Sequence, residues 1–330
     1  MGILRIASQD DLRELIAEAA EKVDGHHFSP HFLMTEWEQV VDGWQLDTWD
    51  SYRDVVRLGR KTRLPESRRA ALWKIFDQVH QSLKARGLLT HASLFSQLTM
   101  RYEAGQPSPF DFIVVDEAQD VSIPQLRLLA ALSAGRSNSL FFAGDLGQRI
   151  FQQPFSWKAL GVDIRGRSHT LRINYRTSHQ IRMQADQLLG PELSDVDGNT
   201  EKRGGTISVF NGPEPTIKTF DTLDNEIKAV SHWLSERINS GMSPDEIGVF
   251  VRSAAELTRA YTAIESTGLK YKVLDEHVNT TSGFVSLCTM HLAKGLEFRA
   301  VAVMACDDEI IPLQERIETV TDDSDLEEVY

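Results

Sequence analysis

The stretch that decides the fold is Phe110-Asp-Phe-Ile-Val-Val-Asp-Glu-Ala-Gln-Asp120, a short apolar run that ends in two adjacent carboxylates. Residues 113–115 are typical of a strand buried on both faces, as in a parallel sheet covered by helices. Asp116 and Glu117 then lie at the carboxyl end of that strand, which is the edge where open α/β sheets bind ligands. The run therefore predicts a parallel α/β sheet with a polar site at this edge.

The two carboxylates favour a site for Mg²⁺ beside a nucleotide. In P-loop NTPases an acidic residue in this place holds the metal that bridges the β- and γ-phosphate oxygens, and a neighbouring carboxylate can accept a proton from the attacking water. Most Asp-Glu pairs at strand ends are only solvated, and a pair of helix N-capping acids ahead of Val121 is the other structural interpretation. The five-residue string Asp-Glu-Ala-Gln-Asp is much rarer than a bare pair.

Three further strings follow in a fixed order. They are Leu140-Phe-Phe-Ala-Gly-Asp-Leu-Gly-Gln148, Leu171-Arg-Ile-Asn-Tyr-Arg-Thr-Ser178 and Thr289-Met-His-Leu-Ala-Lys-Gly-Leu-Glu-Phe298. With the first string they resemble motifs II, III, IV and V of the UvrD/Rep-like superfamily 1 DNA helicases. This resemblance covers residues 110–304 and implies parallel sheets of the RecA-like P-loop NTPase kind. It also implies ATP and Mg²⁺ as cofactors and ATP-driven movement, with 3′ to 5′ polarity, along single-stranded DNA or DNA with a single-stranded tail.

The resemblance assigns the residues around ATP. Asp116 is the expected Mg²⁺ ligand, and Glu117 is the expected base or water-orienting group. Gln148 matches the motif III glutamine that couples the γ-phosphate to DNA. Arg176 matches the motif IV arginine that contacts the γ-phosphate, with a surface salt bridge as its structural alternative. Tyr175 matches the aromatic residue on which adenine stacks.

In motif V, Glu297 matches the acid that contacts the ribose, and Gly295 allows close backbone approach at a strand-to-helix turn. His291 and Lys294 stand where the family contacts DNA phosphates, although a lone histidine is more often structural.

The family also carries an aromatic residue shortly after the motif III glutamine, which stacks on a base of the single strand. That position here is Gln153, so stacking falls to Phe151, Phe155 or Trp157. We choose Trp157, for which a place in the core is an equal alternative.

The net charge of −13 is concentrated at one end, because residues 307–330 hold 10 acidic side chains and 1 basic one. This tail is expected to be a solvated linker. Residues 53–86 instead carry a local excess of seven positive charges, which can track phosphates or can be an ordinary charged helical surface. The ten bases are Arg53, Arg57, Arg60, Lys61, Arg63, Arg68, Arg69, Lys74, Lys84 and Arg86.

At 330 residues with 41% hydrophobic content, the chain is long enough for two or three domains with their own cores. It has no apolar stretch of about 18 residues and no signal-like leader. Its two cysteines, Cys288 and Cys306, stand in apolar runs and are expected to be buried thiols in a reducing compartment. We therefore expect a cytoplasmic protein.

Changes in sequence pattern predict three regions. Residues 1–108 show helical periodicity and match the accessory subdomain that the family inserts ahead of motif II. Residues 109–170, with motifs II and III, form part of a first RecA-like domain, and residues 171–330, with motifs IV and V, form a second one. Expected strands are 111–115, 139–143, 169–173, 206–210, 247–251, 284–288 and 300–304, and expected helices are 123–134, 178–189, 223–239 and 253–266.

Two family elements are missing from the chain. A P-loop needs Gly-x4-Gly-Lys-[Ser/Thr], and the nearest string, Leu58-Gly-Arg-Lys-Thr62, has Arg60 in place of the second glycine. Motif VI is absent as well. We expect a truncated helicase that is inactive alone. The alternative is a non-catalytic DNA-binding or interaction protein that keeps the fold, and a fused nuclease outside the chain is a third hypothesis.

Overall fold

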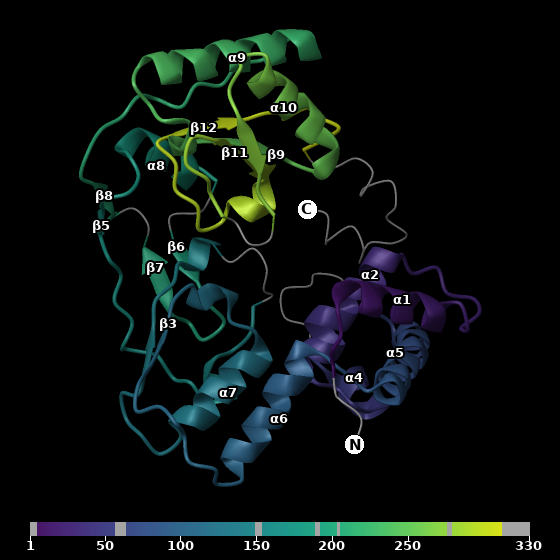
Figure 1. Cartoon of the computed structure of the whole chain (residues 1–330). Coiled ribbons are helices and arrows are strands. Elements are labelled where there is room, and N and C mark those ends of the chain that lie inside the picture. Colours follow the sequence, from purple (N-terminus) through teal and green to yellow (C-terminus); the bar gives the residue numbers. More distant parts are fainter. Residues whose placement is uncertain are drawn as a thin grey trace. The chain divides into compact units, whose positions relative to one another are not determined.

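The chain divides between Pro215 and Thr216 into two units in the computed structural model (Figure 1). The expected domain boundary at 170/171 stays a prediction. The stacking candidate Phe151, the departure at Gln153, and the cluster bases Arg57, Arg60, Lys61 and Arg63 lie outside the described residues. The described residues are 5–56, 64–148, 154–188, 192–202, 205–275 and 279–311, without the side chains of Leu146, Glu201 and Lys202.

The first unit begins with a helical layer. Its helices are α1 (Gln9–Ala20), α2 (Pro30–Glu36), α3 (Asp42–Trp44), α4 (Trp49–Asp54), α5 (Glu66–Arg86) and α6 (His91–Glu103), with one turn of π-helix at Trp37–Val41. α1 starts at a capping box, because the Ser8 hydroxyl accepts from the Asp11 N–H and the Asp11 carboxylate accepts from the Ser8 N–H. α5 ends at Gly87, whose φ of 65° gives the left-handed cap that glycine favours.

The core of this layer confirms the helical periodicity read from the sequence. Leu12, Leu15, Ile16 and Ala19 of α1 are buried, as are Leu72, Ile75, Phe76 and Val79 of α5. Aromatic rings fill the space between the helices, and the centroid of Phe76 lies 5.8 Å from that of Trp37 and 6.1 Å from that of Tyr52. Burial of each such side chain contributes about 1.5–3 kcal/mol to folding.

The expectation of an all-helical first region needs one correction. Strands β1 (Arg5–Ile6) and β2 (Leu88–Leu89) form a parallel pair within it. Two residues are too few to show the alternation of apolar and polar residues that identifies a strand in a sequence.

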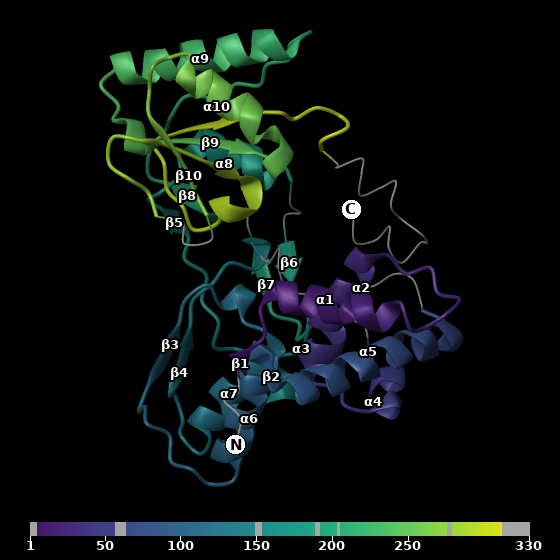
Figure 2. The same ribbon diagram turned by 45° about the vertical axis from the view of Figure 1, so that its right-hand side comes forward.

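The α/β part of the first unit consists of β3 (Ile113–Val115), α7 (Ile123–Ser133) and β4 (Leu140–Phe142). β3 and β4 pair in parallel, with Ile113 opposite Leu140 and Val115 opposite Phe142. α7 packs along α6 (Figures 1 and 2). The expected strands and helix at these positions are confirmed within a few residues.

The expectation that this strand is buried on both faces is wrong for the described chain. Val114 of β3 is 73% exposed and Phe141 of β4 is 62% exposed. Val115 and Phe142, which point to the opposite face, pack against Leu126, Phe155 and their neighbours. Among the residues that the structure describes, only one face of the β3–β4 pair is therefore covered.

The rest of the first unit contains two more strand pairs. β5 (Ile173–Asn174) is parallel to β8 (Ile207–Ser208), and α8 (His179–Asp186) lies between them in sequence. β6 (Glu192–Ser194) and β7 (Thr200–Lys202) form an antiparallel hairpin. No strand is expected from the sequence between residues 190 and 205, so this hairpin is an additional element.

The second unit contains a four-stranded parallel sheet in the order β10-β11-β9-β12, of which Figure 1 labels β11, β9 and β12. Its elements are α9 (Leu223–Asn239), β9 (Ile247–Val251), α10 (Leu257–Glu265), β10 (Tyr271–Val273), β11 (Val285–Thr289) and β12 (Ala300–Val303). α9 and α10 cover one face, and the segment after β11 packs on the other. The expected elements are confirmed, and β10 is an additional strand.

The two cysteines differ in environment. Cys288 in β11 is buried as expected, and burial raises the pKa of its thiol to about 11. Cys306 is exposed, contrary to expectation, because the chain leaves the sheet at Ala305, whose φ is 57°. In the described part of the chain, every helix is too short or too polar to span a bilayer.

Candidate functional site

The ends of β3 and β4 bring motifs II and III to one edge of their sheet. The ladder between the strands continues past their ends: the Ala143 N–H donates to Val115 O, and the Ala118 N–H donates to Ala143 O, both at 2.8 Å. Asp116 and Glu117 consequently follow β3 directly beside the Gly144–Asp145 turn that follows β4. This is the edge at which parallel α/β sheets bind ligands.

The backbone at Glu117 is strained. Its φ of 50° and ψ of 42° are left-handed, a conformation that costs a non-glycine residue about 1 kcal/mol. The Glu117 N–H donates to Asp116 Oδ1 at 2.8 Å, and its carbonyl accepts from the Asp120 N–H at 2.9 Å. Both carboxylates are exposed. Strain of this kind is found where a functional side chain must project from a sharp turn.

The buried side chain of Gln119 connects motif II with motif III. It is 6% exposed, its Nε2 donates to Glu117 Oε2, and its Oε1 accepts from the Asp145 N–H at 3.0 Å. A carboxylate can only accept and a backbone N–H can only donate, so one orientation of the amide satisfies both partners. This residue was not a candidate in the sequence analysis, although it stands within the motif II string.

Asp145 organises the motif III turn. Its Oδ1 accepts from the Gly147 N–H at 2.8 Å, and its Oδ2 accepts from Gln148 Nε2 at 3.0 Å. The exposed side chain of Gln148 is thereby held beside the ends of β3 and β4. The structure thus brings Asp116, Glu117 and Gln148 to the same edge of the β3–β4 pair, and their roles at a nucleotide stay a prediction.

The aromatic residues after motif III contribute to the core beneath β4. Phe155 is 6% exposed, and the partly buried ring of Trp157 meets that of Phe142 edge-on, with centroids 4.8 Å apart. Trp157 therefore packs as part of the core, which is the structural alternative given for it in the sequence. A role for Trp157 in stacking on DNA stays a prediction.

The β6–β7 hairpin contacts this same segment. Asp197 at its tip accepts from Ser156 Oγ at 2.5 Å and from the Lys158 N–H at 3.0 Å. Burial acts to raise the pKa of Asp197, but the hydrogen bonds from Ser156, Lys158 and Trp157 outweigh it and hold the pKa below its ordinary value. The Asp195-Val-Asp-Gly-Asn199 turn residues are the sequence signal that could have revealed this hairpin.

Tyr175 and Arg176 lie on a different sheet of the same unit, just after β5. Asn174 Oδ1 accepts from the N–H groups of Arg176 and Thr177 at 2.8 and 3.1 Å, which fixes the turn into α8. The Tyr175 side chain is 73% exposed. Within the first unit, motif IV is therefore carried by the β5–β8 pair and not by β3 and β4.

Motif V lies in the second unit. After β11 the chain makes a turn at Met290–Ala293, and Gly295 has a φ of 80°, which favours glycine. Leu292, Leu296 and Phe298 pack against Phe250, Leu274 and Cys288. This packing leaves His291 and Glu297 exposed and Lys294 half-buried, with His291 Nε2 3.4 Å from Thr289 Oγ1.

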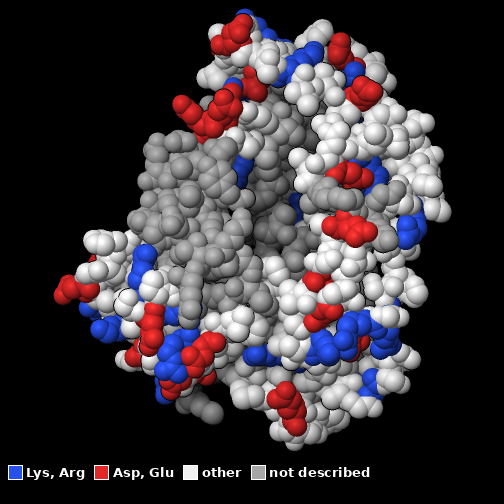
Figure 3. All heavy atoms as spheres, turned by 180° about the vertical axis from the view of Figure 1, so that it is seen from behind, with Lys and Arg blue, Asp and Glu red and all other residues white. Residues whose placement is uncertain are grey.

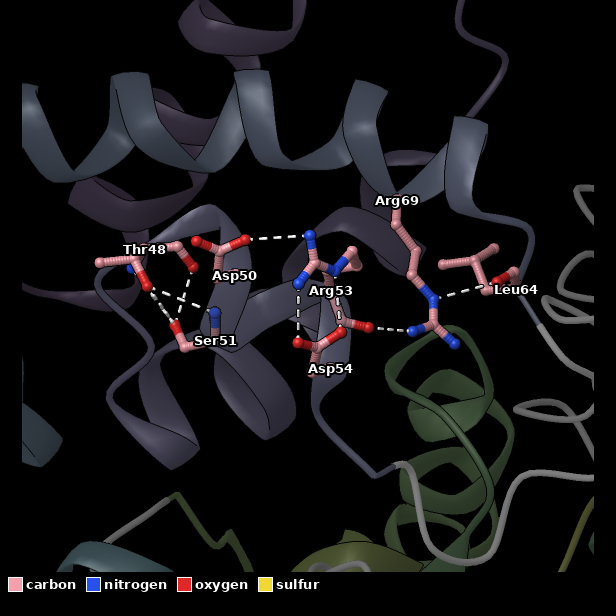
Figure 4. A network of polar contacts seen from close by, with 7 residues as sticks. All are labelled: Thr48, Asp50, Ser51, Arg53, Asp54, Leu64 and Arg69. Carbon is pink, nitrogen blue, oxygen red and sulfur yellow. Dashed lines mark hydrogen bonds and ion pairs between the residues drawn. The ribbon is translucent and has the colours of Figure 1, made fainter.

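Three described bases of the cluster at residues 53–86 are engaged in local interactions, and two of them, Arg53 and Arg69, are shown in Figure 4. Arg53 lies 2.9 Å from Asp50 and 2.8 Å from Asp54, and Arg69 donates to the carbonyl groups of Leu64 and Arg53. Arg86 pairs with Glu18 at 2.8 Å. On the face shown in Figure 3, basic and acidic side chains of the described residues lie interspersed. These contacts favour the ordinary charged surface over a phosphate-tracking patch.

Parallel sheets with paired carboxylates at a carboxyl strand end define an α/β protein whose polar side chains gather at the edge where such sheets bind ligands. Residues 3–156 match the UvrD/REP helicase N-terminal domain, and residues 263–329 match the UvrD-like helicase C-terminal domain. The chain belongs to the UvrD/Rep-like DNA helicase family. Its domains imply a RecA-like α/β fold.

Relatives in this family share modest identity with the chain. A Mycoplasma pneumoniae protein named "Probable DNA helicase" is 24% identical over 210 residues, which are 61% of the chain and 37% of the relative. The ATP-dependent DNA helicase UvrD2 of Mycobacterium tuberculosis is 23% identical over 282 residues, which are 81% of the chain and 37% of the relative. The chain thus spans little more than a third of the length of these relatives.

Proposed function

We propose that the chain is the part of an ATP-dependent DNA helicase or translocase that couples ATP hydrolysis to movement along single-stranded DNA in the 3′ to 5′ direction. The observation that carries this proposal is the shared edge of β3 and β4, where Asp116, Glu117 and Gln148 meet on one hydrogen-bonded turn system. We assign motifs II and III to a first RecA-like domain (residues 109–170) and motifs IV and V to a second (residues 171–330).

The residues at the edge of β3 fit a magnesium ion. Asp116 offers an exposed carboxylate, and Mg²⁺ prefers hard oxygen ligands. Among the described residues, no three His, Cys, Asp or Glu side chains gather as a metal site. Proteins commonly hold Mg²⁺ through one or two carboxylates together with substrate phosphates. When bound, the ion would neutralise the charge that develops on the phosphates.

The other site residues act on the nucleotide and the attacking water. Glu117 orients that water or accepts its proton, and Gln148 contacts the γ-phosphate. Arg176 stabilises charge on the transferred phosphoryl group, and the exposed ring of Tyr175 is available to stack on adenine. Glu297 contacts the ribose and Gly295 permits close backbone approach.

The DNA contacts come from motif V and from the segment after motif III. His291 and Lys294 bind phosphates, for which the exposed imidazole and the lysine beside the Gly295 turn are suited. Trp157 supplies a stacking surface if its ring turns out of the core.

DNA binding by the chain tests this proposal directly. We expect a fluorescein-labelled single-stranded oligonucleotide to bind in an anisotropy titration at low salt, and Lys294→Ala with His291→Ala to weaken binding by about tenfold or more. Lys272→Ala, on β10 of the same unit, is the matched control and should leave affinity unchanged. An oligonucleotide that fails to bind at low salt, or a double variant that binds as well as the parent, contradicts the proposal.

A further inference from the structure

Four residues form a hydrogen-bond relay across the edge of β3 and β4, in which one link is made by the backbone N–H of Asp145. Gln148 Nε2 donates to Asp145 Oδ2 at 3.0 Å, and the Asp145 N–H donates to Gln119 Oε1 at 3.0 Å. Gln119 Nε2 in turn donates to Glu117 Oε2. The relay therefore connects Glu117 with Gln148, which stand 31 residues apart in the sequence.

We propose that Gln119 is a positioning residue that couples the carboxylate of Glu117 to the motif III turn, so that displacement of either changes the position of the other. The functional meaning of this coupling rests on the proposed function, in which Glu117 acts on the attacking water and Gln148 contacts the γ-phosphate. Gln119 itself touches neither substrate nor metal in this proposal.

The chemistry of the glutamine amide suits this role. It gives a donor to the carboxylate and an acceptor to the backbone N–H at once. A glutamate would keep the acceptor for Asp145 but would set a second carboxylate against Glu117. A methionine would fill the same buried space and would satisfy neither partner, which leaves the Asp145 N–H without its acceptor.

Gly144 is the structural condition for the relay. A Cβ atom at this position would lie 2.5 Å from Gln119 Oε1 and 3.1 Å from the Ala118 N. The Oε1 atom therefore has to move if position 144 carries a side chain. Gly144→Ala consequently interrupts the relay without altering Glu117, Gln119 or Gln148 themselves.

The carboxylate of Glu117 is exposed while Gln119 is buried, so a ligand can reach one end of the relay but not its centre. A ligand that draws the Glu117 carboxylate away removes the partner of Gln119 Nε2. The amide is then free to reorient, and the Asp145 turn loses its fixed acceptor. Gln148, held through Asp145, moves with that turn.

Nuclear magnetic resonance of the full chain, with ¹⁵N-labelled glutamine, tests the coupling without ATP or DNA. We expect Glu117→Ala to shift the side-chain amide signal of Gln148 in the parent chain and to produce no such shift in a Gln119→Met background. We also expect hydrogen exchange at the Asp145 N–H to be about tenfold faster in Gln119→Met than in the parent.

Gln125→Met is the matched control, because Gln125 Oε1 accepts from the Ser122 N–H at 2.8 Å on the next turn of the chain. It should leave the response of Gln148 to Glu117→Ala intact. Gly144→Ala keeps the test decisive if Gln119→Met does not fold, and it should abolish the same response. An equal shift of the Gln148 signal with and without Gln119 overturns the coupling, whereas failed DNA binding overturns only the proposed function.

Discussion

The Thr90 hydroxyl donates to Asp42 Oδ1 at 2.6 Å and also accepts from the Ser93 N–H at 3.0 Å, so the N-cap of α6 is tied to the first residue of α3. Gln45 Nε2 donates to the same Asp42 oxygen at 2.7 Å. Burial nevertheless raises the pKa of Asp42 to about 6, because these two hydrogen bonds only partly offset the loss of hydration.

This raised pKa predicts a pH dependence of stability. The folded state holds the Asp42 proton more tightly than the unfolded state. The contribution of Asp42 to the free energy of unfolding therefore falls as pH rises from about 4 to about 6. Above that window the charged, buried carboxylate destabilises the fold. We expect Asp42→Asn, which keeps the accepting oxygen, to stabilise the first unit at pH 8 by on the order of 1–3 kcal/mol and to have little effect at pH 4. Urea unfolding at both pH values measures this, and equal effects at the two would contradict it.

The left-handed backbone at Glu117 predicts an unusual tolerance of glycine. We expect Glu117→Gly to change the free energy of unfolding by less than about 1 kcal/mol in either direction, because glycine adopts a φ of 50° without strain. Glu117→Val should destabilise the fold by about 1–2 kcal/mol more than Glu117→Gly, since a β-branched side chain is disfavoured in this region. Leu94→Gly and Leu94→Val in α6 provide the reference pair for helical backbone, where glycine is the worse substitution. If valine is tolerated better than glycine at position 117, the backbone there is not left-handed.

The chain alone is expected to hydrolyse ATP negligibly. Phosphoryl transfer depends on positioning, and residues 1–330 contain no Gly-x4-Gly-Lys-[Ser/Thr] string to surround the phosphates. A coupled ATPase assay with and without single-stranded DNA measures this. DNA-stimulated turnover of about 1 s⁻¹ or more that Glu117→Gln abolishes would show that another part of the chain cradles the phosphates.

The salt dependence of DNA binding separates the two basic regions. We expect reversal of Arg53 and Arg86 to leave the slope of log K against log salt unchanged, because both arginines already pair with local carboxylates. Lys294→Glu should reduce the magnitude of that slope by about one, as for the loss of a phosphate contact. A smaller slope of log K against log salt in the Arg53 and Arg86 variant would show that the cluster at 53–86 contacts phosphates.

The hydrogen bonds of Asp197 predict how firmly the β6–β7 hairpin is held against residues 156–158. We expect Asp197→Ala to destabilise the hairpin by about 1–3 kcal/mol, because Ser156 and the Lys158 N–H lose a charged acceptor. Asp195→Ala, in the same turn but bonded to Asn199, is the comparison. Hydrogen exchange at the Lys158 N–H should rise in the first variant only.

Elements that carry a local signal could be predicted from the sequence, and those that depend on partners distant in the chain could not. The faces of α1 and α5, the strand at 247–251 and the helix at 223–239 follow from apolar spacing and caps. β1, β2 and β10 were missed because two or three residues set no period, and their pairing is with residues far away in the sequence.

The candidate site shows the same division. Asp116, Glu117 and Gln148 could be placed together because consecutive parallel strands end at one edge. Gln119 could not be given its role, because only the folded turn shows that its amide reaches both Glu117 and Asp145. Cys306 was misjudged because an apolar run predicts burial, whereas the turn at Ala305 directs the chain out of the sheet.

The uncovered face of the β3–β4 pair has a consequence for how the chain behaves in solution. Phe112, Val114 and Phe141 are apolar side chains on or next to this face. Their exposed fractions are 76%, 73% and 62%. Such a surface favours concentration-dependent self-association, binding of hydrophobic dyes and capture by chaperones. We therefore expect Phe112→Ser with Phe141→Ser to raise solubility, while the opposite face keeps the sheet folded.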